Sequence, residues 1–102
     1  MLKITNSMEE IFEQDNAVVA FTATWCNPCK QLKPHFAKAA VIDNETPYYV
    51  VDIDEIKQDY LNKYNIMSVP QVFVMNKGEI VKNIQSRTSD SILKEKEVFN
   101  LA

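Results

Sequence analysis

Apolar positions fall in two kinds of pattern along the chain, and together they predict strands that alternate with helices. Two continuous apolar runs of strand length, residues 17–23 and 48–53, are typical of strands that are buried on both faces. Two later runs, residues 71–75 and 79–85, flank a short turn that contains the only glycine of the chain and predict a β-hairpin. Residues 2–4 are a candidate for one more short strand.

Apolar residues at helical spacing predict four helices in the segments between these runs. The first is short and begins with a capping box, Ser7 followed by Glu10. The second spans about residues 28–40, and Asp54 and Ser89 would cap the third and fourth. The apolar residues that define the four helices are Met8, Ile11 and Phe12; Leu32, Phe36, Ala39 and Ala40; Ile56, Tyr60 and Tyr64; and Ile92 and Phe99. This order of elements indicates an α/β fold, a mixed sheet covered by helices on both faces.

Length and composition limit the classes of protein that fit this pattern. A chain of 102 residues predicts a single domain, residues 1–102, and its 46% hydrophobic and 25% charged residues match those of globular domains. That composition excludes a mainly disordered chain, and two cysteines are too few for a disulfide-rich scaffold. The net charge of −3 and the pI near 5.1 argue against a protein that binds nucleic acid or an anionic membrane.

Nothing in the chain predicts insertion into a membrane or secretion. No apolar run approaches the ~20 residues of a membrane span, and the first six residues lack the apolar core of a signal peptide. We therefore expect a cytoplasmic, monomeric protein that does not bind membranes. Stable structural disulfides are rare in the cytoplasm, so the two cysteines are expected to be catalytic or metal-binding.

The cysteines form a Cys-x-x-Cys motif, Cys26-Asn27-Pro28-Cys29, where the first buried strand ends and a helix begins. The N-terminus of a helix presents unpaired N–H groups and the positive end of the macrodipole, and both favour a thiolate over a thiol. Cysteine pKa values in such settings fall to about 3.5–7.5 from about 8.5. The sequence therefore predicts a redox pair. Cys26, nearer the exposed end, would be the nucleophile, and Cys29, within the first turn, the resolving thiol.

Two other interpretations of the motif stay open at this point. Cys-x-x-Cys is also half of a zinc site, but a tetrahedral structural site needs four cysteine or histidine ligands. The sequence offers only Cys26, Cys29 and His35, and His35 would lie about two and a half helical turns from Cys26. The other interpretation is a pair of inert buried cysteines, which the position between a strand and a helix disfavours.

The residues around the motif resemble the active site of the thioredoxin family. Trp25-Cys26-Asn27-Pro28-Cys29-Lys30 is similar to the Trp-Cys-Gly-Pro-Cys-Lys sequence of that family. Further similar segments, in the same order along the chain, are Phe21 to Ala23, Pro34, Asp52-Ile53-Asp54, Ile66-Met67-Ser68-Val69-Pro70 and Lys77-Gly78-Glu79. The resemblance covers essentially the whole chain. It implies a thioredoxin fold, with a central mixed sheet of four to five strands flanked by four helices.

The resemblance also implies which residues surround the reaction. Pro70 would be cis and would face the cysteines, and the backbone of Val69 would pair with an extended substrate strand. Trp25 and Met67 would add apolar surface beside that strand. The residues expected to tune the active site are Trp25, Asn27, Pro28 and Lys30. The redox-active disulfide between the two cysteines would take the place of any separate cofactor, with no metal.

The chain departs from the family pattern at several positions. Ala20 replaces a buried aspartate, and Val50 or Val51 replaces its buried lysine partner, so both members of an ion pair are missing together. The family carboxylate takes and returns the proton of the resolving cysteine. Without this carboxylate, we expect water to take the proton of Cys29 and the resolving step to be slower. The other departures are Asn27, Ser68 and Ser86 in place of glycines, and Thr22 in place of a second tryptophan.

Three functions follow from these observations. The leading one is a reductase of protein disulfides, kept reduced by a thioredoxin reductase or a similar electron donor. A disulfide oxidant or isomerase is the near alternative, and the expected cytoplasmic location weighs against it. A redox-independent docking module for a partner enzyme is an alternative from another class, kept open by the missing carboxylate and glycines.

Overall fold

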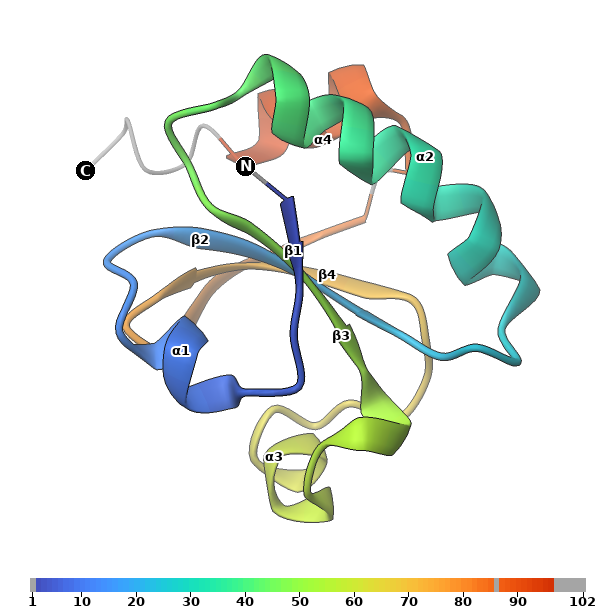
Figure 1. Cartoon of the computed structure of the whole chain (residues 1–102), viewed down its shortest axis with the longest axis vertical. Helices are drawn as coiled ribbons and strands as arrows, with labels where there is room; N and C mark the ends of the chain where they lie inside the picture. Colours follow the sequence, from blue (N-terminus) through green and yellow to red (C-terminus); the bar gives the residue numbers. More distant parts are fainter. Residues whose placement is uncertain (1, 86, 97–102) are drawn as a thin grey trace.

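The computed structural model describes residues 2–85 and 87–96 and places a five-stranded sheet at the centre of the protein (Figure 1). The strands are β1 (Leu2–Ile4), β2 (Ala17–Thr22), β3 (Tyr48–Asp52), β4 (Gln71–Asn76) and β5 (Glu79–Ile84). Their order in the sheet is β1-β3-β2-β4-β5. β3 runs parallel to both β1 and β2, whereas β4 runs antiparallel to its neighbours β2 and β5, so the sheet is mixed.

Helices cover both faces of this sheet. The α-helices in the described part of the chain are α1 (Met8–Phe12), α2 (Asn27–Ile42), α3 (Gln58–Lys63) and α4 (Ser89–Glu95). α2 and α4 lie on one face, and α1 and α3 lie on the other (Figure 1). This arrangement confirms the α/β architecture expected from the sequence. Within residues 2–85 and 87–96, no helix has the length and apolar character needed to cross a membrane.

β2 is the strand that leads into the cysteine motif, and all of its residues are buried. Val18 and Ala20 pack in the core cluster on the side of α2 and α4. Val19 and Phe21 pack in the cluster on the side of α1 and α3. Because helices cover both faces of the strand, every position is apolar or small, which explains the continuous apolar run in the sequence.

The prediction that Asp54 caps the third helix is wrong. The chain first forms a short 3-10 turn (Ile53–Glu55), which the Asp52 side chain caps by accepting a 2.9 Å hydrogen bond from the Asp54 N–H. α3 starts only at Gln58, after Lys57, which makes no side-chain capping bond. Asp54 therefore stands outside the helix, and its carboxylate is used elsewhere.

The starts of the other short helices were predicted more closely. Ser7 caps α1 as expected, since its side chain accepts a hydrogen bond from the third residue of the helix. The prediction that Ser89 caps the last helix is wrong by one residue, because Thr88 accepts the capping bond from the Ser91 N–H at 3.3 Å. Phe99, expected on the apolar face of that helix, lies outside the described residues.

The C-terminal end of α2 is tied to the rest of the fold by a carboxylate. Asp43 Oδ2 accepts a 3.0 Å hydrogen bond from the Tyr48 hydroxyl and lies 2.9 Å from Lys96 Nζ. Burial raises the pKa of the Asp43 carboxyl, but the hydrogen bonds from Lys96 and Tyr48 outweigh it and hold that pKa below its usual range. The ionised carboxylate thereby joins α2 to β3 and to the residue that follows α4.

The hairpin turn between β4 and β5 packs closely against its neighbours. Gly78 has a φ of +85°, a conformation that favours glycine. A Cβ at this position would lie 2.8 Å from the Phe12 ring of α1. The Gly78 carbonyl accepts a 2.7 Å hydrogen bond from the Tyr64 hydroxyl, and the Lys77 N–H donates to the Gln14 carbonyl at 2.8 Å. The turn is therefore packed against α1 and hydrogen-bonded to its neighbours.

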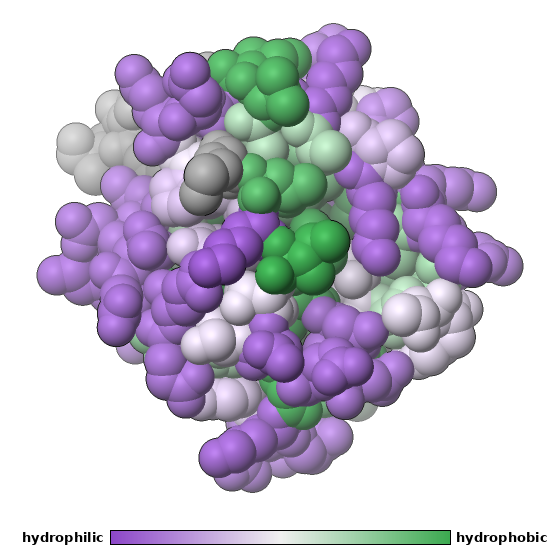
Figure 2. Space-filling view, viewed as in Figure 1, coloured by the Kyte–Doolittle hydropathy of each residue, from purple (hydrophilic) through white to green (hydrophobic). Residues whose placement is uncertain are grey.

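One face of the protein carries an apolar stripe. Figure 2 shows apolar surface running over β1 and the C-terminal end of α2 between polar side chains. The exposed large apolar residues of these two elements are Leu2, Ile4, Val41 and Ile42. β1 is an edge strand, which accounts for the exposure of its side chains.

Candidate active site

The sheet and α2 together place Cys26 at the start of a helix. β2 ends at Thr22 and α2 begins at Asn27, and Cys26 is the extended N-cap residue of α2, with φ −94° and ψ 110°. Its Sγ accepts a 3.2 Å hydrogen bond from the Cys29 N–H. The sulfur thus occupies the position that a serine or aspartate oxygen takes at other helix N-termini, where negative charge is stabilised.

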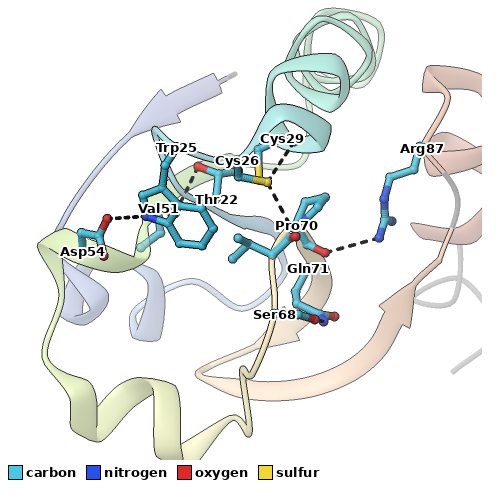
Figure 3. The surroundings of a disulfide bond; sticks show 11 residues. Thr22, Trp25, Cys26, Cys29, Val51, Asp54, Ser68, Pro70, Gln71 and Arg87 are labelled. Atoms are coloured by element: carbon cyan, nitrogen blue, oxygen red, sulfur yellow. Dashed lines mark hydrogen bonds between the residues drawn. A yellow bond between two sulfur atoms is a disulfide. The ribbon is translucent and has the colours of Figure 1, made fainter.

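The two cysteines are joined by a disulfide and differ in burial (Figure 3). Their Cα atoms lie 5.3 Å apart. Cys26 is 5% exposed and Cys29 is 0% exposed, so a sulfur that approaches from solvent reaches Cys26 first. Pro28 lies in the first turn of α2, where its missing N–H leaves no hydrogen bond unmade.

The loop before β4 forms the opposite wall of the site. The Val69–Pro70 peptide bond is cis, as the resemblance implied. Cys26 Sγ lies 3.6 Å from the Val69 carbonyl oxygen. Val69 also packs, together with Ile53, on a small buried cluster that contains both cysteines. The structure therefore brings the motif and the cis-proline loop together, although they are more than 40 residues apart in the chain.

Trp25 stands at the edge of the disulfide and is fixed by a contact that the sequence did not predict. Its side chain is 65% exposed, and its Nε1 donates a 3.0 Å hydrogen bond to Asp54 Oδ2. The Asp54 carboxylate, which was expected to cap a helix, accepts this bond instead. Met67, in the loop that carries Val69, is 87% exposed. Both residues proposed as apolar substrate contacts therefore present their side chains to solvent.

The two remaining residues expected to tune the site lie in the first turn of α2. Asn27 and Lys30 are both exposed, and the Lys30 N–H donates a 3.3 Å hydrogen bond to the Cys26 carbonyl. The role of either side chain stays a prediction.

The position of the missing ion pair is filled by apolar side chains. Ala20 and Val50 are register partners in the sheet, are 1% and 6% exposed, and share one core cluster. Val51 belongs to the cluster on the other face, so Val50 is the residue that faces Ala20. Thr22 is buried, and its hydroxyl donates to the Val51 carbonyl at 3.5 Å. Ser86 lies outside the described residues.

Sequence reasoning missed Arg87. Its guanidinium donates a 3.4 Å hydrogen bond to the Pro70 carbonyl (Figure 3). It also donates to the carbonyls of Ile84 and Gln85, at 3.2 and 3.0 Å. It therefore links the cis-proline loop to the end of β5. No spacing or motif in the sequence signals this contact, because it depends on how the loop folds back.

Among residues 2–85 and 87–96, no three histidine, cysteine or carboxylate side chains lie together in a way that could hold a metal ion. His35 is exposed on α2.

A cysteine pair at the N-terminus of a helix, facing a cis-proline loop, defines the protein as a thiol–disulfide oxidoreductase. The family model described as "Thioredoxin" matches residues 2–97. The chain is 36% identical over 78 residues to the thioredoxin of Mycoplasma genitalium, which covers 76% of each chain. It belongs to the thioredoxin family.

Two further comparisons extend this result. The chain is 33% identical over 86 residues to protein disulfide-isomerase A4 of Mus musculus, which covers 81% of this chain but only 14% of that relative. The solution structure of oxidised thioredoxin from Plasmodium falciparum superposes with a TM-score of 0.80 at 25% identity, over 97% of this chain and 98% of that chain. The fold is the thioredoxin fold. The activity is disulfide reduction by thiol–disulfide exchange at Cys26 and Cys29, acting on protein disulfides.

Proposed function

We propose that in this disulfide reductase Cys26 is the nucleophile and Cys29 the resolving thiol. The observation that carries the proposal is the 3.2 Å hydrogen bond from the Cys29 N–H to Cys26 Sγ at the N-terminus of α2. This donor and the positive end of the helix dipole favour negative charge on that sulfur, so Cys26 would be the thiolate at neutral pH. The complete burial of Cys29 supports its later role.

The reaction proceeds by two exchanges at sulfur. The Cys26 thiolate attacks one sulfur of the substrate disulfide and forms a mixed disulfide, and the other substrate sulfur leaves as a thiolate. Cys29 then loses its proton, and its thiolate attacks the Cys26 sulfur. This step forms the Cys26–Cys29 disulfide and releases the second substrate thiolate. Two electrons pass to the substrate, whose two thiolates take protons from solvent.

Water is the proposed base for the second exchange. The position from which the family carboxylate would act holds Ala20, and its neighbour Val50 is also apolar. The proton of Cys29 would therefore pass to solvent without a side-chain relay, and the resolving step would be slower near neutral pH.

An extended segment of the substrate would lie along the cis-proline loop and pair with the backbone of Val69. The 3.6 Å separation between Cys26 Sγ and the Val69 carbonyl oxygen supports this placement, because a strand bonded there carries its own cysteine to Cys26. The exposed side chains of Trp25 and Met67 would contact apolar residues of the substrate.

The oxidised pair would be restored by a two-electron dithiol donor, a thioredoxin reductase or a similar protein. We place this cycle in the cytoplasm, where such donors keep thiols reduced. One chain supplies the cysteines, the cis-proline loop and the exposed apolar residues, so a monomer would suffice for the reaction.

A disulfide isomerase or oxidant is the second candidate, and the 33% identity to protein disulfide-isomerase A4 favours it. The equilibrium reduction potential of the Cys26–Cys29 pair in a dithiol buffer separates the two candidates. We expect about −270 mV for a reductase, whereas a value near −180 mV would indicate an isomerase. Absence of any reversible two-electron couple would overturn both and favour a docking module.

A further inference from the structure

A small pocket opens beside the cysteine motif. It has a volume of about 220 Å³ and lies between the first turns of α2 and the start of α4. The residues that line it are Pro28, Gln31, Leu32, His35, Arg87 and Thr88. Pro28 belongs to the cysteine motif, so the pocket and the active site share a wall.

Arg87 connects this pocket to the cis-proline loop. Its Nη2 donates to the Pro70 carbonyl at 3.4 Å, and its Nη1 donates to the carbonyls of Ile84 and Gln85. These bonds hold the guanidinium on the far side of the disulfide from Trp25 (Figure 3). A substrate strand on the cis-proline loop would therefore pass between an indole on one side and a guanidinium on the other.

The lining of the pocket suits a carboxylate. The Arg87 guanidinium donates to three backbone carbonyls, which are uncharged, so it keeps its positive charge and attracts a carboxylate. The Gln31 amide and the His35 imidazole are exposed side chains of the same pocket and add further donors. None of the described lining residues is acidic, although the chain as a whole has a net charge of −3. Leu32, which is buried, supplies apolar surface for methylene groups.

We propose that this pocket is a substrate subsite that takes an acidic side chain, and that Arg87 determines the preference. The proposal rests on the proposed function, because it assumes that the substrate lies along the cis-proline loop with its cysteine at Cys26. The recognised residue is a glutamate or aspartate within a few residues of the substrate cysteine, on the side of the loop that faces Arg87.

The test uses short peptides in which one cysteine forms a disulfide with a small neutral thiol. Two pairs are needed, with Glu or Gln two residues before the cysteine and with Glu or Gln two residues after it. The fully reduced protein is mixed with each peptide, and the second-order rate constant of reduction is followed by the fluorescence of Trp25, the only tryptophan of the chain. The variants are Arg87→Gln, Arg87→Lys and the control Lys38→Gln. Lys38 is an exposed residue further along α2, and its substitution makes the same charge change.

In one of the two pairs we expect the wild type to reduce the Glu peptide about 3- to 10-fold faster than the Gln peptide at low ionic strength. The ratio should fall towards one in molar salt, because screening weakens exposed charge pairs. Arg87→Gln should abolish the ratio, Arg87→Lys should keep part of it, and Lys38→Gln should leave it unchanged.

Three results would overturn the subsite. One is equal rates for Glu and Gln peptides in both pairs with the wild type, which needs no variant to fold. The second is a ratio that persists in Arg87→Gln while both rates fall together, since Arg87 would then only position the loop. The third is a loss of the Glu-to-Gln rate ratio in Lys38→Gln as large as the loss in Arg87→Gln. Reduction of neither peptide by the wild type would instead overturn the proposed function, and the subsite with it.

Discussion

Replacing Ala20 by aspartate would put a carboxyl group into the apolar cluster between the sheet and α2. Ala20 is 1% exposed, its register partner Val50 is 6% exposed, and both pack with Leu32 and Phe36. The pKa of a fully buried carboxyl rises by up to about 3–5 units. A rise of about three units, at about 1.36 kcal/mol each, lowers the free energy of unfolding of Ala20→Asp by about 4 kcal/mol at neutral pH.

The destabilisation should depend on pH in one direction. The introduced carboxyl has a higher pKa in the folded than in the unfolded state, so the folded variant binds more protons between those two values. Relative to the wild type, its loss of unfolding free energy should therefore be smallest below about pH 4. The loss should then grow by about 1.4 kcal/mol per pH unit until the folded pKa is reached.

Urea unfolding between acid and neutral pH measures this profile. Ala20→Asn is the matched control, because it adds a polar group of similar size that does not ionise, and its loss should not vary with pH. Adding Val50→Lys to Ala20→Asp should recover part of the stability at neutral pH by supplying the missing partner. Parallel pH profiles for Ala20→Asp and Ala20→Asn would refute the reasoning.

The same variant tests the resolving step. Above the folded pKa of the introduced carboxyl, Ala20→Asp should release a mixed disulfide faster than the wild type, because a base then stands near Cys29. Release followed by stopped flow at several pH values measures this. An unchanged rate would mean that water alone already deprotonates Cys29 efficiently.

Two further predictions concern the ends of α2. Asp43→Asn should lose about 1–3 kcal/mol of unfolding free energy at pH 7, because the carboxylate that accepts from Tyr48 and Lys96 is gone. Because the pKa of Asp43 is lowered in the folded state, its contribution to the free energy of unfolding is full above the unfolded pKa and is lost as the pH falls. The urea midpoints of the wild type and the variant should therefore converge in acid. A gap that stays constant with pH would contradict the lowered pKa. At the other end, Cys29→Ser should accumulate a mixed disulfide at Cys26 that mass spectrometry detects, whereas accumulation in Cys26→Ser instead would reverse the assigned roles.

Much of the site could be predicted because its main parts are local. A buried strand followed by Cys-x-x-Cys and a helix is contiguous in sequence, and periodicity alone places Cys26 where β2 ends and α2 begins. The physical effect that follows, stabilisation of a thiolate by helix N–H groups, needs only this local geometry.

The contacts that could not be predicted join distant segments. Asp54 carries the signal of a helix cap, yet its carboxylate binds Trp25, 29 residues earlier, because the chain makes a 3-10 turn first. The choice between Val50 and Val51 is a one-residue difference in register, which moves a side chain to the opposite face of the sheet. Only the pairing of β2 with β3 settles it, by placing Val50 opposite Ala20.

The packing of Gly78 bears on how the protein could be engineered. Exposed hairpin turns are usual sites for inserting a tag or grafting a peptide loop. Here the turn packs on the Phe12 ring, accepts a hydrogen bond from the Tyr64 hydroxyl and donates one to the Gln14 carbonyl. An insertion would therefore disturb α1, α3 and the hairpin at once. A fusion partner is better attached elsewhere on the surface, and the Gly78 turn is better left unchanged.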